Sequence, residues 1–234
     1  MIKIDKINVY GWDTAIRGMR NPLNSWAKSD SGYGCGELKC GYCGLVDCPA
    51  WNRRYIVGEN DLSLMKKLVK SGPDHSKFMR QIIVSMDITA PLYWWKEFDT
   101  YKVGTVANSC STMHKIHAKE FTKDDFSCEH LLTGSMFQLH RTIDLLNEAR
   151  EAYLECTVSK YGTAEEAQIF KKTYWWQMIQ LLPSSYNQLR TVTLNYAVAR
   201  NMYHARKNHK LDEWHVLCDA IRTLPYAEDL ICDG

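Results

Sequence analysis

The chain has 234 residues, of which 45% are hydrophobic and 24% charged, as in globular proteins that bury a sizeable core. Its formal net charge of +2 argues against a protein whose main function is to bind duplex nucleic acid, because neutralising the phosphates requires a high local concentration of Lys and Arg. The first residues carry no signal-like apolar block, and no apolar run is long enough to cross a bilayer. We therefore expect a cytoplasmic protein without a membrane partner.

The first half of the chain predicts two short strands and two helices. Charged and apolar residues alternate over 2–10, and 82–88 is rich in β-branched residues, which is typical of strands. Asp61 is expected to cap an amphipathic helix, whose inward face carries Leu62, Met65, Leu68 and Val69. Pro91, in the permitted first turn, is expected to open a second helix. Its apolar residues, which we assign to core packing, are Tyr93, Trp94, Trp95 and Phe98.

The second half predicts mainly helix after an irregular polar stretch at 104–132. A long helix is expected over 134–160, with the inward-facing residues Phe137, Leu139, Ile143, Leu146, Ala149, Tyr153 and Leu154. Thr163 begins a capping box for the next helix. Further helices are expected over 185–208 and 212–222. The sequence therefore predicts an α+β fold, in which a small mixed sheet is flanked by long helices.

A glycine- and cysteine-rich segment at about 30–56 reads as an insertion in a single domain that spans residues 1–234. Its cysteines follow the pattern C-x4-C-x2-C-x4-C and are Cys35, Cys40, Cys43 and Cys48. Four thiolates can surround Zn²⁺ tetrahedrally, and cytosolic cysteines are more often metal ligands or free thiols than disulfides. A zinc site is therefore predicted here. An iron–sulfur cluster and a flexible insertion with free thiols are the alternatives.

The segment that points to a function is a helix running into a loop dense with polar side chains. Residues 90–114 read APLYWWKEFDTYKVGTVANSCSTMH, with hydroxyls, amides, a thiol and a lysine in the loop. Burying such groups without partners is costly, so they are typical of a polar ligand site. A plain polar connection is the alternative.

This segment resembles the flavin-dependent thymidylate synthases (the ThyX family), of which the chain would be a divergent member. That family has Ala-Pro at a helix start, then Arg-His-Arg, followed by a spaced Ser, Asn-Glu, Ser and Arg-Tyr. Without gaps, these fall here on Thr100-Tyr101-Lys102, Thr105, Ala107-Asn108, Cys110 and Thr112-Met113, and a preceding Gln falls on Glu97. The C-terminal half keeps the family's intervals at Leu182-Pro183, Asn195 and Arg206.

The resemblance implies a homotetramer that binds FAD and reduces it with NADPH. It further implies transfer of a carbon unit from methylenetetrahydrofolate to C5 of dUMP. The residues implied to face the flavin are Thr100, Tyr101, Lys102, Asn108 and Asn195. Those implied to face the pyrimidine nucleotide are Glu97, Cys110, Thr112 and Arg206. Arg206 is the implied catalytic residue, because a fixed cation stabilises negative charge that develops on a carbonyl oxygen.

Several cations of the family pattern are missing. Only Lys102 remains of the basic tripeptide, and Thr112 stands where the family has an arginine, which binds phosphate in a bidentate way that threonine cannot. The expected compensating cations are Arg17, Arg20, Lys115 and Arg190. One alternative is therefore an enzyme that methylates or hydroxymethylates another pyrimidine nucleotide. Another is a non-catalytic nucleotide- or nucleic-acid-binding protein with a zinc loop. Cys110 as a nucleophile toward the uracil ring is a further hypothesis, set against a cysteine that only packs.

Overall fold

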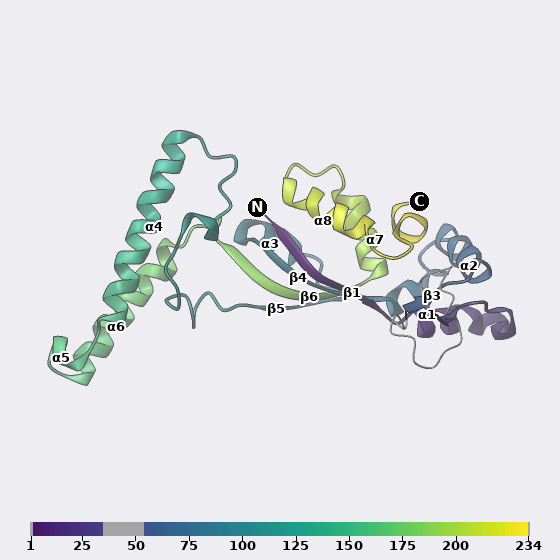
Figure 1. The fold of residues 1–234 in the computed structure, drawn as a ribbon, viewed down its shortest axis with the longest axis horizontal. Coiled ribbons are helices and arrows are strands. Elements are labelled where there is room, and N and C mark those ends of the chain that lie inside the picture. The colour runs from purple at the N-terminus through teal and green to yellow at the C-terminus, as the bar shows by residue number, and fades with distance from the viewer. Residues whose placement is uncertain (1, 35–53, 234) are drawn as a thin grey trace, which may run out of the picture. The chain divides into compact units, whose positions relative to one another are not determined.

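The computed structural model describes residues 2–34 and 54–233 (Figure 1). The chain forms two compact units. Unit 1 comprises Met1–Asp5, Asp87–Lys102 and Ala107–Val192. Unit 2 comprises Lys6–Met86, Val103–Val106 and Thr193–Gly234. The strands of the main sheet contribute residues to both units.

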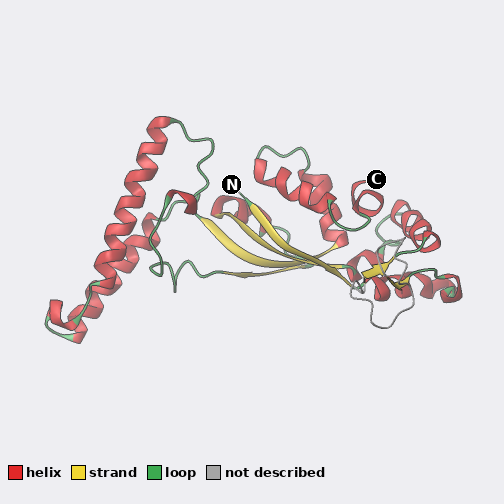
Figure 2. Ribbon diagram, viewed as in Figure 1, coloured by secondary structure: helices red, strands yellow, loops and turns green. Residues whose placement is uncertain are grey.

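The main sheet has four strands in the order β1-β4-β6-β5, and β2 and β3 form a separate two-stranded ladder (Figure 2). The strands are β1 (Lys3–Tyr10), β2 (Gly32–Gly34), β3 (Arg54–Ile56), β4 (Ile83–Pro91), β5 (Thr105–Ser109) and β6 (Asn187–Asn195). In unit 1, the Leu92 N–H donates to the Tyr186 carbonyl at 3.0 Å, joining the end of β4 to the start of β6. In unit 2, the Tyr196 N–H donates to the Ile82 carbonyl at 3.0 Å, at the opposite ends of the two strands. The two central strands, β4 and β6, are therefore antiparallel to each other. The prediction from the sequence was a mixed sheet.

Helices occupy more of the chain than strands, and the predicted α+β class is confirmed. They are α1 (Trp12–Arg20), α2 (Glu59–Lys70), α3 (Leu92–Phe98), α4 (Thr133–Leu154), α5 (Val158–Tyr161), α6 (Ala164–Leu181), α7 (Tyr196–Arg206) and α8 (Asp212–Arg222). The predicted cap of α6 is present, since the Thr163 side chain accepts the Glu166 N–H. Among the described residues, no helix combines the length and apolarity needed to span a membrane.

The segment 185–208, predicted as one helix, is instead strand β6 followed by helix α7. Val192 and Leu194 are buried two residues apart and follow an alternating pattern, as in a strand with one inward face. Asn195 then ends the strand, because its Oδ1 accepts the Val198 N–H at 3.0 Å and caps α7. The stretch 104–132, predicted as irregular, holds strand β5, and helix α1 lies in a segment for which no element was predicted.

Asp61 does not cap α2, contrary to the prediction. The helix begins two residues earlier, and the Asp30 carboxylate accepts two backbone N–H groups of its first turn at 2.9 and 3.1 Å. Asp61 is fully buried and accepts hydrogen bonds from Arg20 Nε at 2.6 Å and from the hydroxyls of Ser29 and Ser31 at 2.7 and 2.6 Å. Asp61 therefore anchors the stretch that leads into β2.

The core of unit 1 lies against α4 and α6, which run side by side (Figure 1). Its buried residues are Ile116, Phe121, Phe126, Leu139, Ile143, Leu146, Ala149 and Met178. Four of the residues predicted to face inward on the long helix belong to this cluster. Two others face outward, since Phe137 is 74% exposed and Leu154 is 49% exposed. Trp94 and Trp95 are buried, as predicted.

The core of unit 2 is built around aromatic contacts. Trp12 meets the rings of Tyr196 and Tyr226 edge-on, with centroid distances of 5.3 Å in both cases. Gly11 positions Trp12 at the start of α1 with a φ of 88°, and a Cβ there would lie 2.2 Å from the Gln81 carbonyl oxygen. Only glycine allows this close approach of two backbone segments.

Candidate functional site

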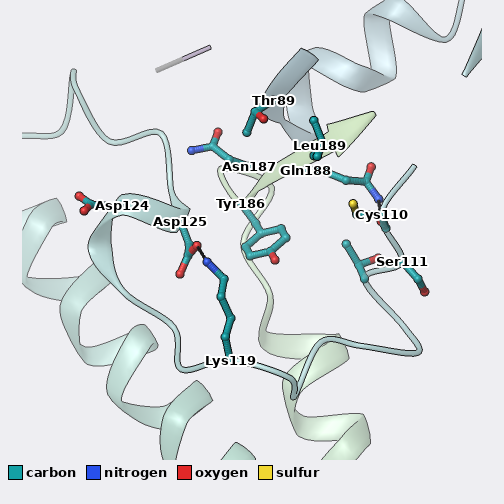
Figure 3. Close-up of a pocket in the computed structure, with 11 residues that line it drawn as sticks. Thr89, Cys110, Ser111, Lys119, Asp124, Asp125, Tyr186, Asn187, Gln188 and Leu189 are labelled. Atoms are coloured by element: carbon teal, nitrogen blue, oxygen red, sulfur yellow. Dashed lines mark hydrogen bonds and ion pairs between the residues drawn. The ribbon is translucent and has the colours of Figure 1, made fainter. Parts of the chain in front are cut away.

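A cavity of about 260 Å³ lies in unit 1, where β5 ends beside the start of β6 (Figure 3). We call it the β5–β6 cavity. It is lined by Thr89, Cys110, Ser111, Thr112, Lys119, Asp124, Asp125, Tyr186, Asn187, Gln188 and Leu189. Ser111 turns the chain away from β5, because its Oγ accepts the backbone N–H groups of Met113 and His114 at 3.2 and 2.9 Å. This turn leaves Cys110 and Thr112 on one wall of the cavity.

Tyr186 lies in the middle of the cavity, between Cys110 and the ion pair of Lys119 with Asp125 (Figure 3). Burial raises the pKa of the Tyr186 phenol, and the nearby Asp125 carboxylate raises this pKa further. The phenol therefore stays protonated at neutral pH and can donate a hydrogen bond. Asp125 also accepts the Thr122 N–H at 2.9 Å, so the acid is held in place from two sides.

A chain of hydrogen bonds behind the cavity fixes the backbone at Cys110. Gln188 Nε2 donates to the Cys110 carbonyl at 2.7 Å, and Gln188 Oε1 accepts from Arg190 Nε at 3.0 Å. The Arg190 guanidinium also donates to Asp99 Oδ1 at 2.8 Å and lies 4.2 Å from the centroid of the Trp95 ring. Gln188 is buried and satisfied at both ends of its amide, so this wall of the cavity is rigid.

The charges that line the cavity suit a polar ring better than a phosphate. One lysine faces two carboxylates, Asp124 and Asp125, which gives the side chains a net charge of 1 − 2 = −1. Lys119 is already paired with Asp125. The hydroxyls, the phenol and the Asn187 amide offer donors and acceptors to a heterocycle, whereas a phosphate dianion would find no unpaired cation here.

Two of the residues implied by the resemblance, Cys110 and Thr112, lie together in the cavity. The others in unit 1 do not line it. Glu97 lies on α3, Thr100-Tyr101-Lys102 follow that helix directly, and Asn108 is exposed on β5. The Thr100 hydroxyl donates to the Glu97 carbonyl at 2.7 Å and so closes the turn after α3.

Asn195 and Arg206 lie in unit 2, at opposite ends of α7. They are separated by roughly 16 Å along the axis, at the usual rise of about 1.5 Å per residue. The Arg206 guanidinium lies 4.6 Å from the centroid of the Trp214 ring. Asn195 and Arg206 therefore do not contact each other within one copy of the chain.

Two of the four expected compensating cations are engaged elsewhere. Arg20 is buried against Asp61, and Arg190 is paired with Asp99. Neither guanidinium is placed to replace the arginines that the family pattern has and this chain lacks. Arg17 and Lys115 are exposed.

Four residues that line the cavity were not predicted as site residues from the sequence, namely Lys119, Tyr186, Asn187 and Gln188. The run of β-branched residues at 191–193 was the available signal, because it predicts a strand whose entry would carry Tyr186, Asn187 and Gln188 into the sheet. No signal in the sequence marks Lys119, which reaches the cavity through its contact with the turn at Asp125.

The predicted zinc ligands Cys35, Cys40, Cys43 and Cys48 lie outside the described residues. Within 2–34 and 54–233, no group of three or more His, Cys, Asp or Glu side chains is arranged to hold a metal ion.

No protein-family model and no curated protein matches the sequence. Solved structures match along its whole length. A crystal structure of thymidylate synthase X from Helicobacter pylori with FAD and dUMP has a TM-score of 0.59 at 14% identity, covering 100% of this chain and 98% of that one. The chain has the fold of thymidylate synthase X. A second structure of the same enzyme, also complexed with FAD and dUMP, has a TM-score of 0.58 at 14% identity and covers 98% of this chain and 99% of its own.

The residues at the flavin-facing positions of the thymidylate synthase X pattern fit a flavin in kind. The Thr100 hydroxyl donates to the Glu97 carbonyl and keeps its lone pairs as acceptors, Tyr101 carries a phenol, and Lys102 carries one cation that suits a pyrophosphate. Asn195 uses its Oδ1 for the cap of α7 and keeps its Nδ2 as a donor. The donor set is thus suited to the ring and ribose, and it has fewer cations than the family's Arg-His-Arg.

Proposed function

We propose that this chain is a flavin-dependent enzyme that transfers a carbon unit to C5 of a pyrimidine nucleotide. The leading reaction is the reductive methylation of dUMP with methylenetetrahydrofolate, with NADPH as the source of electrons for FAD. One observation carries the proposal: the whole chain matches the fold of an enzyme crystallised with FAD and dUMP, and two motif positions, Cys110 and Thr112, meet in one polar cavity.

We assign the side chains to the pyrimidine ring or to the flavin according to their chemistry. We assign the β5–β6 cavity to the pyrimidine ring, with the protonated Tyr186 phenol and the Asn187 amide as hydrogen-bonding partners. Thr100, Tyr101, Lys102, Asn108 and Asn195 are assigned to the flavin, and Glu97 to the nucleotide. A bound reduced flavin would supply the hydride that the methylation needs. Arg206 is assigned to the developing negative charge on the ring carbonyl.

Completion of the site by further copies of the chain is part of the proposal. Asn195 and Arg206 lie at opposite ends of α7, so we assign them to different ligands, the flavin and the pyrimidine nucleotide, and propose that other protomers complete both pockets. The helices α4 and α6 also expose large apolar side chains, which are Phe137, Leu154, Ile169, Phe170, Trp176 and Leu181. Large exposed apolar surfaces mark protein contacts. We propose a homotetramer, and a sedimentation mass equal to one chain would contradict it.

The direct test is a visible absorption spectrum of the purified protein after incubation with FAD. We expect the protein to retain the bands of oxidised flavin through gel filtration, and addition of dUMP to perturb them. Product analysis with methylenetetrahydrofolate and NADPH then reports C5 methylation. A colourless protein that does not take up FAD would contradict the proposal and favour the non-catalytic alternative.

A change of substrate is the second candidate, and the charges around the cavity favour it. The chain has Thr112 in place of an arginine, and the cavity side chains sum to a negative charge. We therefore propose a parallel assay with dCMP and with the corresponding triphosphates, for both methylation and hydroxymethylation. Turnover of dUMP alone would exclude this alternative.

Cys110 is expected to be alkylated by iodoacetamide and to be protected by bound dUMP. Its thiol is exposed and lines the β5–β6 cavity. Cys218 is the internal control, because it is buried and burial raises the pKa of its thiol to about 11. Peptide mapping by mass spectrometry measures both sites. Equal labelling of Cys110 with and without dUMP would remove it from the nucleotide site, and full activity after labelling would exclude a nucleophilic role.

We propose that Cys35, Cys40, Cys43 and Cys48 bind one zinc ion, on the strength of their number and spacing. Elemental analysis of protein purified without chelator is expected to find close to one equivalent of zinc. Replacing Cys40 and Cys43 with serine is expected to abolish it. Less than about a tenth of an equivalent of any metal in the unaltered protein would contradict the proposal.

A further inference from the structure

A second cavity in unit 1, of about 350 Å³, is formed by α6 and the C-terminal part of α4. We call it the α4–α6 cavity. It is lined by Tyr153, Gln168, Lys171, Lys172 and Trp175, and shares no residue with the β5–β6 cavity. Its volume lies within the range of small-molecule sites, roughly 300–1,000 Å³.

The α4–α6 cavity is positively charged. Lys171 and Lys172 line it, no carboxylate does, and neither lysine forms an ion pair within the part of the chain that the structure describes. The pKa of the nearby His117 imidazole is consistent with a positive electrostatic potential. Burial lowers this pKa, and the charges of Lys115, Lys171 and Arg150 lower it further. Uncompensated cations around a concave surface attract an anion.

One aromatic ring in the cavity is positioned for stacking. Trp175 is held in place by its Nε1, which donates to the Met113 carbonyl at 2.9 Å, and its ring is half-buried. Tyr153 is already engaged, because the His117 ring packs on it at 4.5 Å and Lys171 Nζ lies 4.9 Å from its centroid. Trp175 meets the Trp176 ring edge-on, with a centroid distance of 4.8 Å, and packs against the core of unit 1. The part of its ring that lines the cavity is the surface on which a planar ligand would stack.

The cavity is built on rigid elements. Both walls are long helices packed against the core of unit 1, and Arg150 Nε donates to the His117 carbonyl at 3.0 Å, which ties the preceding loop to α4. His117 also has a buried Nδ1 without a hydrogen-bond partner in the structure. The helices therefore present the lining residues from a fixed backbone, although the two lysine side chains would still lose rotamer freedom on binding an anion.

We propose that the α4–α6 cavity binds a nucleoside phosphate, separately from the proposed catalytic site. Lys171 and Lys172 would neutralise the phosphates, and the base would stack on Trp175. Gln168 adds an amide that can donate to and accept from the base or ribose. A planar ring joined to a polyanion is the ligand chemistry that matches both halves of this cavity.

The test uses ADP as the probe and the full chain, with and without saturating FAD and dUMP, so that the proposed catalytic site is filled in one arm. Isothermal titration calorimetry is expected to show one ADP per chain in both arms. The paired substitutions Lys171→Gln and Lys172→Gln are expected to weaken ADP binding by at least about tenfold. The matched control, Lys67→Gln with Lys70→Gln on α2, removes the same charge from an exposed helix in unit 2 and is expected to leave affinity unchanged.

Two further measurements separate the parts of the proposal. Trp175→Leu is expected to weaken ADP binding by about tenfold and to leave binding of inorganic pyrophosphate unchanged, because stacking requires the ring. Absence of ADP binding to the unaltered chain, or unchanged affinity in the paired lysine variant, would overturn the proposal. Equal affinity of the unaltered chain for pyrophosphate and ADP would show that the base does not stack on Trp175. Loss of ADP binding only when FAD is present would assign the probe to the flavin site.

Discussion

Replacing Asp61 with alanine is expected to destabilise the protein by about 3–5 kcal/mol, the cost of leaving a buried charge without its partner. Arg20 is 4% exposed, and its Nε lies 2.6 Å from Asp61 Oδ1. Ser29 and Ser31 would lose their acceptor in the same change. Urea unfolding, followed by circular dichroism, measures the effect as a shift of the midpoint at constant slope.

Two variants control for this result. Asp74→Ala removes an exposed carboxylate and is expected to change the free energy of unfolding by no more than about 0.5 kcal/mol. The double variant Arg20→Met with Asp61→Leu is expected to be more stable than Asp61→Ala, because no charge is left buried. A loss below about 1 kcal/mol for Asp61→Ala would show that the pair is hydrated and contributes little.

The same carboxylate makes stability depend on acid pH. Burial alone would raise the pKa of Asp61, but hydrogen bonds from Ser31, Ser29 and Arg20 outweigh burial and hold the pKa below its ordinary value. A lowered folded-state pKa contributes stability that is complete above the unfolded pKa of about 3.9 and is lost as pH falls through the folded value. The advantage of the unaltered chain over Asp61→Asn should therefore be constant from neutral pH to about pH 5 and shrink below about pH 4.

Replacing Arg206 with alanine is expected to lower nucleotide-dependent turnover by about 100-fold or more, as removal of one fixed donor to a developing oxyanion does in other enzymes. Part of the stability cost is the loss of the contact to the Trp214 ring, a cation–π pair worth about 0.5–1 kcal/mol. Steady-state kinetics with dUMP and a thermal melt separate the two effects. A large loss of turnover with a nearly unchanged melting temperature is the expected result.

Lys207→Ala is the matched control for Arg206. It removes one positive charge at the next position, where the exposed ammonium lies 5.6 Å from the centroid of the Tyr203 ring. Turnover should be unchanged in this variant. If both variants lose activity equally, the effect belongs to the general positive charge at the end of α7, and unchanged turnover in Arg206→Ala would remove Arg206 from the site.

Local patterns predicted the fold where local interactions determine the structure. The capping residue Thr163 and the helix over 212–222 were predicted correctly, because caps and amphipathic faces are readable within a few residues. Strand β6 was mistaken for helix because its identity depends on pairing with β4, about a hundred residues earlier in the chain. Asp61 was mistaken for a cap because its partner Arg20 lies far away in sequence.

Only the part of the candidate site that lies within one short segment could be predicted from the sequence, because local patterns do not report long-range contacts. Cys110 and Thr112 belong to one short segment whose polarity and spacing are visible in the sequence. Tyr186 and Gln188 reach the cavity through the sheet, and Lys119 through an ion pair with Asp125. These residues become neighbours of Cys110 only after long-range pairing, which no periodicity in a single sequence reports.

The small ladder of β2 and β3 has a consequence for how this protein can vary. Gly34 lies opposite Arg54 in this ladder, so the two described residues that flank the cysteine-rich segment are neighbours. The entropy of closing such a segment rises only with the logarithm of its length. A change in the number of residues between Gly34 and Arg54 is therefore expected to leave the register of β2 and β3 unchanged.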